Sequence, residues 1–181
     1  MKILLTSNVL IPEVAAQLGV TTASSGGWIQ ASTESLRRYT SDITLGIVTT
    51  HPELARRGYT HNDITHYVIQ NDVRSMTRPP HRWFITAMRD IINDFQPDVI
   101  HVNGSEYSYG MAVKMARPDI PALLSIQGIS FIWRNVHQRI LPLKERLRYD
   151  TLRDLASLLV MRKQESMERK TIASFSHICG R

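Results

Sequence analysis

The sequence predicts an α/β fold in which a doubly wound, Rossmann-like parallel sheet carries helices on both faces. Two observations lead to this prediction. Short, nearly continuous apolar runs recur along the chain, as in strands that are buried on both faces. Segments with the apolar spacing of amphipathic helices separate these runs. Alternating strands and helices form a parallel sheet through right-handed crossovers, which place helices on both sides.

The size and composition of the chain suit one globular domain over residues 1–181. Of the 181 residues, 43% are hydrophobic and 21% are charged. A single cysteine excludes a disulfide framework within the chain and is typical of a reducing compartment. No apolar run approaches the roughly 20 residues that span a bilayer, and no signal-peptide core is present. We therefore expect a cytoplasmic protein. Its net charge of +6 allows an anionic partner: phosphate, a membrane surface or nucleic acid.

The first part of the chain is expected to contain three strands and one helix. Ile29, Leu36 and Tyr39 share one helical face, and Leu45 and Ile47 alternate as in a strand. In order, we expect a strand over 1–8, a loop over 9–27, a helix over 28–41, a strand over 42–51, an irregular polar stretch over 51–64 and a strand over 65–70.

The second part begins with the clearest helix, over residues 77–98. Pro79 and Pro80 suit a helix start, Pro97 ends it, and apolar residues between them recur at helical spacing. The remaining elements are a strand over 98–104, a helix over 105–119, a strand over 120–128, a mostly helical and basic region over 131–175 and a strand over 175–181.

Polar, glycine-bearing loops follow several of the predicted elements. In open parallel sheets, ligands bind at the carboxyl ends of the strands. We therefore expect one ligand site where three loops meet: the glycine pair Gly26–Gly27, residues 102–110 (VNGSEYSYG) and residues 125–130 (SIQGIS).

Several common catalytic motifs are absent. The sequence has no P-loop, no dinucleotide-binding glycine pattern after the first strand and no nucleophile elbow. His61, Asp63 and His66 form the densest group of potential metal ligands, but their spacing matches no established metal site. We expect a polar surface loop there and no metal or cofactor.

Five segments occur in an order that resembles a known family. They are MKILLTSN, GGW at the start of a helix, QPDVIHVNG, PALLSIQG and HICGR. Together they resemble the N-terminal domain of a GT-B glycosyltransferase, and most closely the family-4 group of retaining sugar transferases. The resemblance spans essentially the whole chain.

The resemblance implies half of a two-domain enzyme. Such enzymes transfer a sugar from a nucleotide-sugar donor to a glycan or lipid-linked acceptor, as in cell-surface polysaccharide synthesis, and they require no metal. The N-terminal domain mainly binds the acceptor. The C-terminal domain binds the donor through two glutamates separated by seven residues, and no two glutamates of this chain have that spacing. We expect the donor domain to be absent and the chain alone to be inactive.

The resemblance and the loop positions together name the candidate donor- and acceptor-binding residues. The family often has histidines where this chain has Asn103 and Gln127, so amides would replace imidazoles as sugar contacts. No catalytic base can be assigned. The full candidate set is Gly26, Gly27, Trp28, Asn103, Gly104, Glu106, Tyr107, Gln127 and Gly128.

Structural interpretations compete with these functional ones. The glycine pair could be an ordinary turn, Trp28 a hydrophobic anchor, and Tyr107 a packing residue. Ser105 is expected to cap the helix over 105–119, with Glu106 in its first turn. Three further residues are expected to be structural: His101 as a core histidine, Asp98, and Cys179 as an inert core thiol.

The region over 131–181 holds half of the chain's lysines and arginines. Either this surface docks on anionic lipid at the inner face of the membrane, or it is a solvated helical face. A non-catalytic, flavodoxin-like binding module is the alternative to a transferase. Nucleic-acid binding is not expected, because no helix-turn-helix or RNA-binding signature is present.

Overall fold

The computed structural model describes residues 1–21, 27–126, 132 and 152–180, and its strands form one sheet in the order β3-β4-β2-β1-β5-β6-β7. Neighbouring strands are parallel except β3, which is antiparallel to β4. The α/β, Rossmann-like prediction is thereby confirmed. The strands are β1 (Lys2–Thr6), β2 (Thr44–His51), β3 (Arg56–His61), β4 (Ile64–Gln70), β5 (Val99–Asn103), β6 (Ala122–Ile126) and β7 (His177–Gly180).

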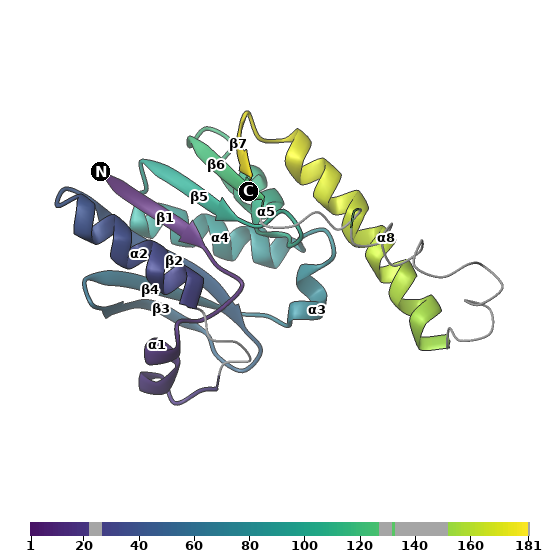
Figure 1. Cartoon of the computed structure of the whole chain (residues 1–181), viewed down its shortest axis with the longest axis horizontal. Coiled ribbons are helices and arrows are strands. Elements are labelled where there is room, and N and C mark those ends of the chain that lie inside the picture. The colour runs from purple at the N-terminus through teal and green to yellow at the C-terminus, as the bar shows by residue number, and fades with distance from the viewer. Residues whose placement is uncertain (22–26, 127–131, 133–151, 181) are drawn as a thin grey trace.

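Helices lie on both sides of this sheet, as Figure 1 shows. Within the described residues, two helices cover one face and two the other, while the last turn of α8 contacts α5. The helices are α1 (Pro12–Gln17) and α2 (Gly27–Tyr39) on the first face, α4 (Arg82–Phe95) and α5 (Tyr109–Ala116) on the second, the short α3 (Val73–Met76), and α8 (Leu152–Ala173).

The two faces have separate hydrophobic cores because side chains alternate along each strand. In β1, Ile3 and Leu5 point toward α1 and α2, whereas Leu4 points toward α4 and α5. The amino end of β1 is tied to β5 by Asp98, whose Oδ2 accepts a hydrogen bond from the backbone N–H of Lys2 at 2.7 Å. The structural interpretation of Asp98 is therefore confirmed.

Two elements lie where no regular structure was expected. Helix α1 lies within the predicted loop over 9–27, with Pro12 at its first position, where proline is well tolerated. Strand β3 lies in the polar stretch over 51–64. A tight turn at Asn62 and Asp63, with φ of 48° and 57°, joins it to β4 as a hairpin. His66, expected in a surface loop, is instead buried in β4.

The helix predicted over 105–119 begins later than expected, at Tyr109. Ser105 therefore does not cap it, and Glu106 is not in its first turn. The Ser105 hydroxyl instead donates a hydrogen bond to Oε1 of Glu168 on α8, at 2.7 Å. The capping prediction was wrong because the Ser105 hydroxyl is hydrogen-bonded to Glu168, which lies 63 positions away in the chain.

The basic region over 131–175 is described only in part. Helix α8 confirms helical structure over Leu152–Ala173, and the predicted strand after it is present as β7. Among its described side chains, Arg162, Lys163, Arg169 and Lys170 are exposed to solvent. The prediction for 133–151 lies outside the described residues.

Candidate functional site

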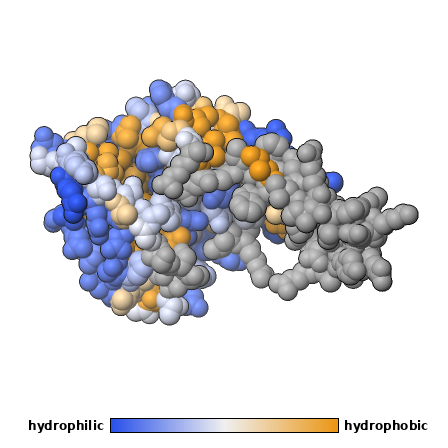
Figure 2. Space-filling view, viewed as in Figure 1, coloured by the Kyte–Doolittle hydropathy of each residue, from blue (hydrophilic) through white to orange (hydrophobic). Residues whose placement is uncertain are grey.

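A groove of about 530 Å³ lies over the carboxyl-terminal half of β5, β6 and β7, beside the first turns of α2. Helices α1 and α2 cover β1, β2 and β4 on this face, and the groove occupies the neighbouring half. Figure 2 views this face, and hydrophobic residues gather at the surface over β5–β7, beside the largely hydrophilic surface over α2. The side chains that line it include Trp28 and Ser32 from α2, His101 and Asn103 from β5, Ser125 from β6 and Cys179 from β7.

Asn103 occupies the point where the order of the sheet reverses. From β1 the chain continues to β2 on one side and later returns to β5 on the other, so the carboxyl ends of β1 and β5 border a crevice. Asn103 bridges these ends: its side-chain amide donates to the carbonyl of Thr6 at 2.9 Å, and its backbone N–H donates to the Thr6 hydroxyl at 3.2 Å. The amide is thus held in one orientation at the wall of the groove.

Three polar side chains from adjacent strands form a hydrogen-bonded row along the groove. Nε2 of His101 lies 2.6 Å from the hydroxyl of Ser125, and that hydroxyl lies 2.9 Å from Sγ of Cys179. Burial lowers the pKa of His101, so its ring is neutral at neutral pH. The neutral ring can donate a hydrogen bond to the Ser125 hydroxyl or accept one from it.

This row corrects two structural interpretations. His101 is only half-buried and lines the groove, so it is not an enclosed core histidine. Cys179 is exposed and is not a core thiol. The two expectations were wrong for different reasons: alternate side chains of β5, including His101, lie on the groove face, whereas Cys179 belongs to an edge strand whose four residues are all exposed.

The glycine pair and the amide at 127 are only partly described. Gly26, Gln127 and Gly128 lie outside the described residues. Gly27 is the first residue of α2, and a Cβ atom added there would meet no atom within 4 Å. The backbone at Gly27 thus has room for a side chain, so its conformation does not require glycine. The neighbouring Trp28 is 38% exposed and lines the groove, which does not fit a buried hydrophobic anchor.

The remaining candidates of the β5–α5 loop point away from the groove. Gly104 has a φ of +85° and turns the chain after β5. Tyr107 packs against the core on the α4–α5 face. The carbonyl of Glu106 accepts a hydrogen bond from the side-chain amide of Gln164 on α8, at 3.1 Å. The structure therefore brings Trp28 and Asn103 together in the groove and separates Glu106 and Tyr107 from it.

The carboxyl group of Glu106 has a raised pKa although it lies in a loop. Burial raises the pKa of its carboxyl group, the nearby Glu168 raises it further, and hydrogen bonds from the backbone N–H groups of Glu106 and Ser105 oppose both. Its Oε2 atom is buried and has no hydrogen-bond partner among the described residues. This carboxyl group consequently favours the protonated form more than an exposed glutamate does.

The described parts of the chain contain neither a metal cluster nor a membrane-crossing helix. Within residues 1–21, 27–126 and 152–180, no three histidine, cysteine or acidic side chains are arranged to hold a metal ion. Within the same ranges, no helix is both long enough and apolar enough to cross a bilayer.

Sequence reasoning placed Ser125 in a loop of the expected site but missed His101 and Cys179 as groove residues, although a signal was present for His101. His101 and Asn103 are two positions apart on one strand, and this spacing places polar residues on one face. Comparison with known proteins adds no family: no family model and no curated protein matches the chain. Fold and groove define a Rossmann-like α/β domain with a polar site at the carboxyl ends of its strands.

Proposed function

We propose that this chain is the acceptor-side half of a retaining GT-B glycosyltransferase, which transfers a sugar from a nucleotide-sugar donor to a glycan or lipid-linked acceptor in cell-surface polysaccharide synthesis. The observation that carries the proposal is the groove beside α2. It combines an exposed indole, from Trp28, with a row of neutral hydrogen-bonding groups along β5, β6 and β7.

This combination suits a carbohydrate better than a charged ligand. A sugar offers C–H faces that stack on an aromatic ring and hydroxyl groups that both donate and accept hydrogen bonds. Asn103 and Ser125 supply matching amide and hydroxyl groups, and the neutral imidazole of His101 can serve as donor or acceptor. Among the described lining residues there is no Lys, Arg, Asp or Glu, so a free phosphate would find no charged partner there.

Cytoplasmic location and docking to anionic membrane lipid are part of the proposal. The exposed Arg162, Lys163 and Lys170 of α8 support the docking element, because basic helices associate with anionic bilayers. Sedimentation with vesicles tests it: we expect binding to vesicles that contain phosphatidylglycerol and none to phosphatidylcholine alone. Equal recovery with both vesicles would favour a solvated helical face.

Saturation-transfer NMR of the chain with a panel of oligosaccharides tests the sugar-binding element. We expect transfer to the ring protons of at least one glycan, and loss of that signal in Trp28→Ala. Trp83→Ala is the matched control, because Trp83 is 49% exposed but lies on α4, outside the groove. Loss of one stacking contact should weaken binding by about tenfold, which corresponds to roughly 1.4 kcal/mol.

Two results would count against the proposal. If Trp83→Ala weakens glycan binding as much as Trp28→Ala, the groove is not the binding site. If no glycan gives a signal but a nonsugar ligand binds in the groove, the chain is better described as a flavodoxin-like binding module.

A further inference from the structure

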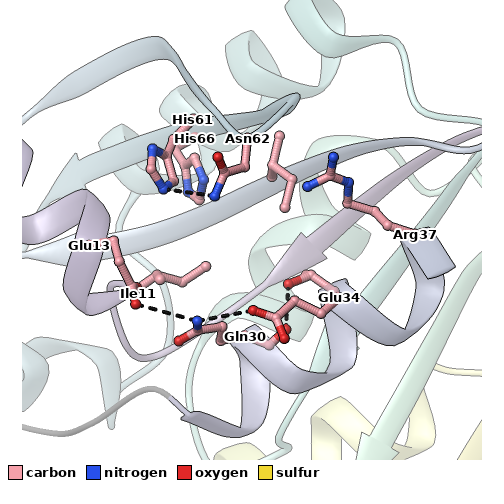
Figure 3. A pocket seen from close by; sticks show the side chains of 10 residues that line it. Ile11, Glu13, Gln30, Glu34, Arg37, His61, Asn62 and His66 are labelled. Carbon is pink, nitrogen blue, oxygen red and sulfur yellow. Dashed lines mark hydrogen bonds between the residues drawn. The ribbon is translucent and has the colours of Figure 1, made fainter.

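A second, smaller cavity lies on the flank of α2 that faces the β3–β4 hairpin. Its volume is about 110 Å³. A water molecule occupies about 30 Å³ in the liquid, so this cavity suits a molecule of only a few non-hydrogen atoms. Figure 3 shows two walls: Glu13, Gln30 and Glu34 from α1 and α2 lie opposite His61, Asn62 and His66 of the hairpin.

The floor of this cavity contains a histidine without a hydrogen-bond partner. His66 is 1% exposed, and neither of its ring nitrogens is hydrogen-bonded to the described residues. The neighbouring Thr33 donates its hydroxyl proton to carbonyls of its own helix, those of Ile29 and Gln30. Buried polar groups of native proteins almost always have a hydrogen-bond partner. We therefore expect the ring of His66 to have a partner inside the cavity.

A partner that can both donate and accept a hydrogen bond can pair with either ring nitrogen of His66. Burial lowers the pKa of His66 to about 4, and the nearby His61 contributes to this shift. The ring is therefore neutral at neutral pH, with one N–H group and one nitrogen lone pair. A hydroxyl group can satisfy either nitrogen, whereas an ammonium group can satisfy only the lone pair.

The rim of the cavity carries two carboxylates. Glu13 and Glu34 are both exposed, and the side-chain amide of Gln30 donates to each of them, at 3.3 and 3.0 Å. A neutral amide leaves both negative charges in place. The rim therefore attracts a group that is positively charged and rich in N–H donors.

The other polar residues of the rim leave this negative charge uncompensated. The guanidinium of Arg37 is paired with Asp63, which lies outside the cavity lining, at 3.1 Å. Nε2 of His61 lies 3.1 Å from Nδ2 of Asn62, so these two polar groups of the hairpin wall pair with each other. An anionic ligand is disfavoured here.

A metal ion does not satisfy this cavity, because no three of its acidic and histidine side chains are arranged to bind one. We propose that the cavity binds a small amino alcohol, with its ammonium group against the carboxylates of Glu13 and Glu34 and its hydroxyl group on the ring of His66. This site is separate from the groove and independent of the proposed sugar transfer.

Titration of the chain with ethanolamine, followed by NMR signals of the His66 ring, tests the proposal. We expect a saturable shift of these signals. Ethylene glycol lacks the charge, and ethylamine lacks the hydroxyl group. Each should bind at least about tenfold more weakly than ethanolamine, as expected for the loss of one charge-assisted or buried hydrogen bond. No saturable response to ethanolamine would show that water alone fills the cavity, and an equal response to all three compounds would show that neither proposed contact forms; either result would overturn the proposal.

Variants separate the two contacts. Glu34→Gln should weaken ethanolamine binding about tenfold, whereas Glu53→Gln, at an exposed glutamate outside the cavity, should not change it. His66→Leu should remove the preference for ethanolamine over ethylamine, measured by backbone amide shifts of α2, because only the hydroxyl contact is lost. If Glu34→Gln and Glu53→Gln have equal effects, or if the preference survives in His66→Leu, the proposal is wrong.

Discussion

Replacing Gly104 with alanine should destabilise the domain through two separable effects. The first is backbone strain, since Gly104 has a φ of +85°. A side chain in this left-handed region costs about 1–2 kcal/mol. The second is a clash, since a Cβ atom at this position would lie 2.6 Å from Oε2 of Glu106 and 2.9 Å from its Oε1.

The clash is costly although the side chain of Glu106 is flexible. The backbone N–H groups of Ser105 and Glu106 stabilise its charged carboxyl group where it lies, so moving it away loses part of that stabilisation. Overpacking of this kind costs about 1–3 kcal/mol. The sum is near 3 kcal/mol, and at about 3 °C per kcal/mol for a chain of this length the melting temperature should fall by about 10 °C.

Thermal denaturation followed by circular dichroism in a double-mutant cycle separates the two effects. Gly104→Ala in the Glu106→Ala background should cost only the strain, about 1–2 kcal/mol. Gly27→Ala is the control, because nothing lies within 4 Å of a Cβ atom there; its stability should be unchanged or slightly raised. Equal costs of Gly104→Ala with and without Glu106 would refute the contact, and a neutral Gly104→Ala would refute the loop conformation.

Three further predictions concern titratable side chains. Ser125→Ala should slow iodoacetamide labelling of Cys179, measured by mass spectrometry, about fivefold, since a lost hydrogen bond is worth about 1 kcal/mol; an unchanged rate would mean that the Ser125 hydroxyl does not affect the reactivity of the thiol. His66 has a pKa of about 4 in the folded state, so its neutral form stabilises the fold above pH 6.5, and up to about 3 kcal/mol should be lost as the pH falls to 4. His66→Leu should remove that part of the acid sensitivity in urea titrations, and an identical pH dependence would contradict the burial of the ring. The raised pKa of Glu106 means that ionisation opposes folding, so stability falls as the pH rises through the folded pKa; Glu106→Gln should be more stable than the wild type at pH 7 and no more stable at pH 3.

The sheet could be predicted because its strands are locally encoded. Apolar runs such as that of β5 read as buried strands whatever their surroundings, and Pro97 sets the end of α4 independently of tertiary contacts. Strand β3 could not be recognised by hydrophobicity, because an edge strand has a solvated side. Its signal lies instead in the turn, where Asn62 and Asp63 tolerate positive φ.

The sequence predicts the region of the candidate site but not which side chains come together there. The rule that ligands bind at strand carboxyl ends selects Asn103 and the first turn of α2, and both line the groove. It does not say which way loop side chains point, so Glu106 was grouped with Asn103 although it faces α8. The row from His101 to Cys179 depends on the order of β5, β6 and β7, which periodicity does not encode.

The two outer strands of the sheet differ in how they could meet another chain. Strand β3 is polar, and its pairing with β4 is interrupted by a bulge between Arg56 and Tyr59, a feature that discourages edge-to-edge association. Strand β7 pairs in register with β6 along its whole length, and all four of its residues are exposed. Its outer backbone groups pair with no other strand in the described part of the chain. Lengthening of this sheet by strand addition would therefore proceed in one direction only, outward from β7 and next to Cys179.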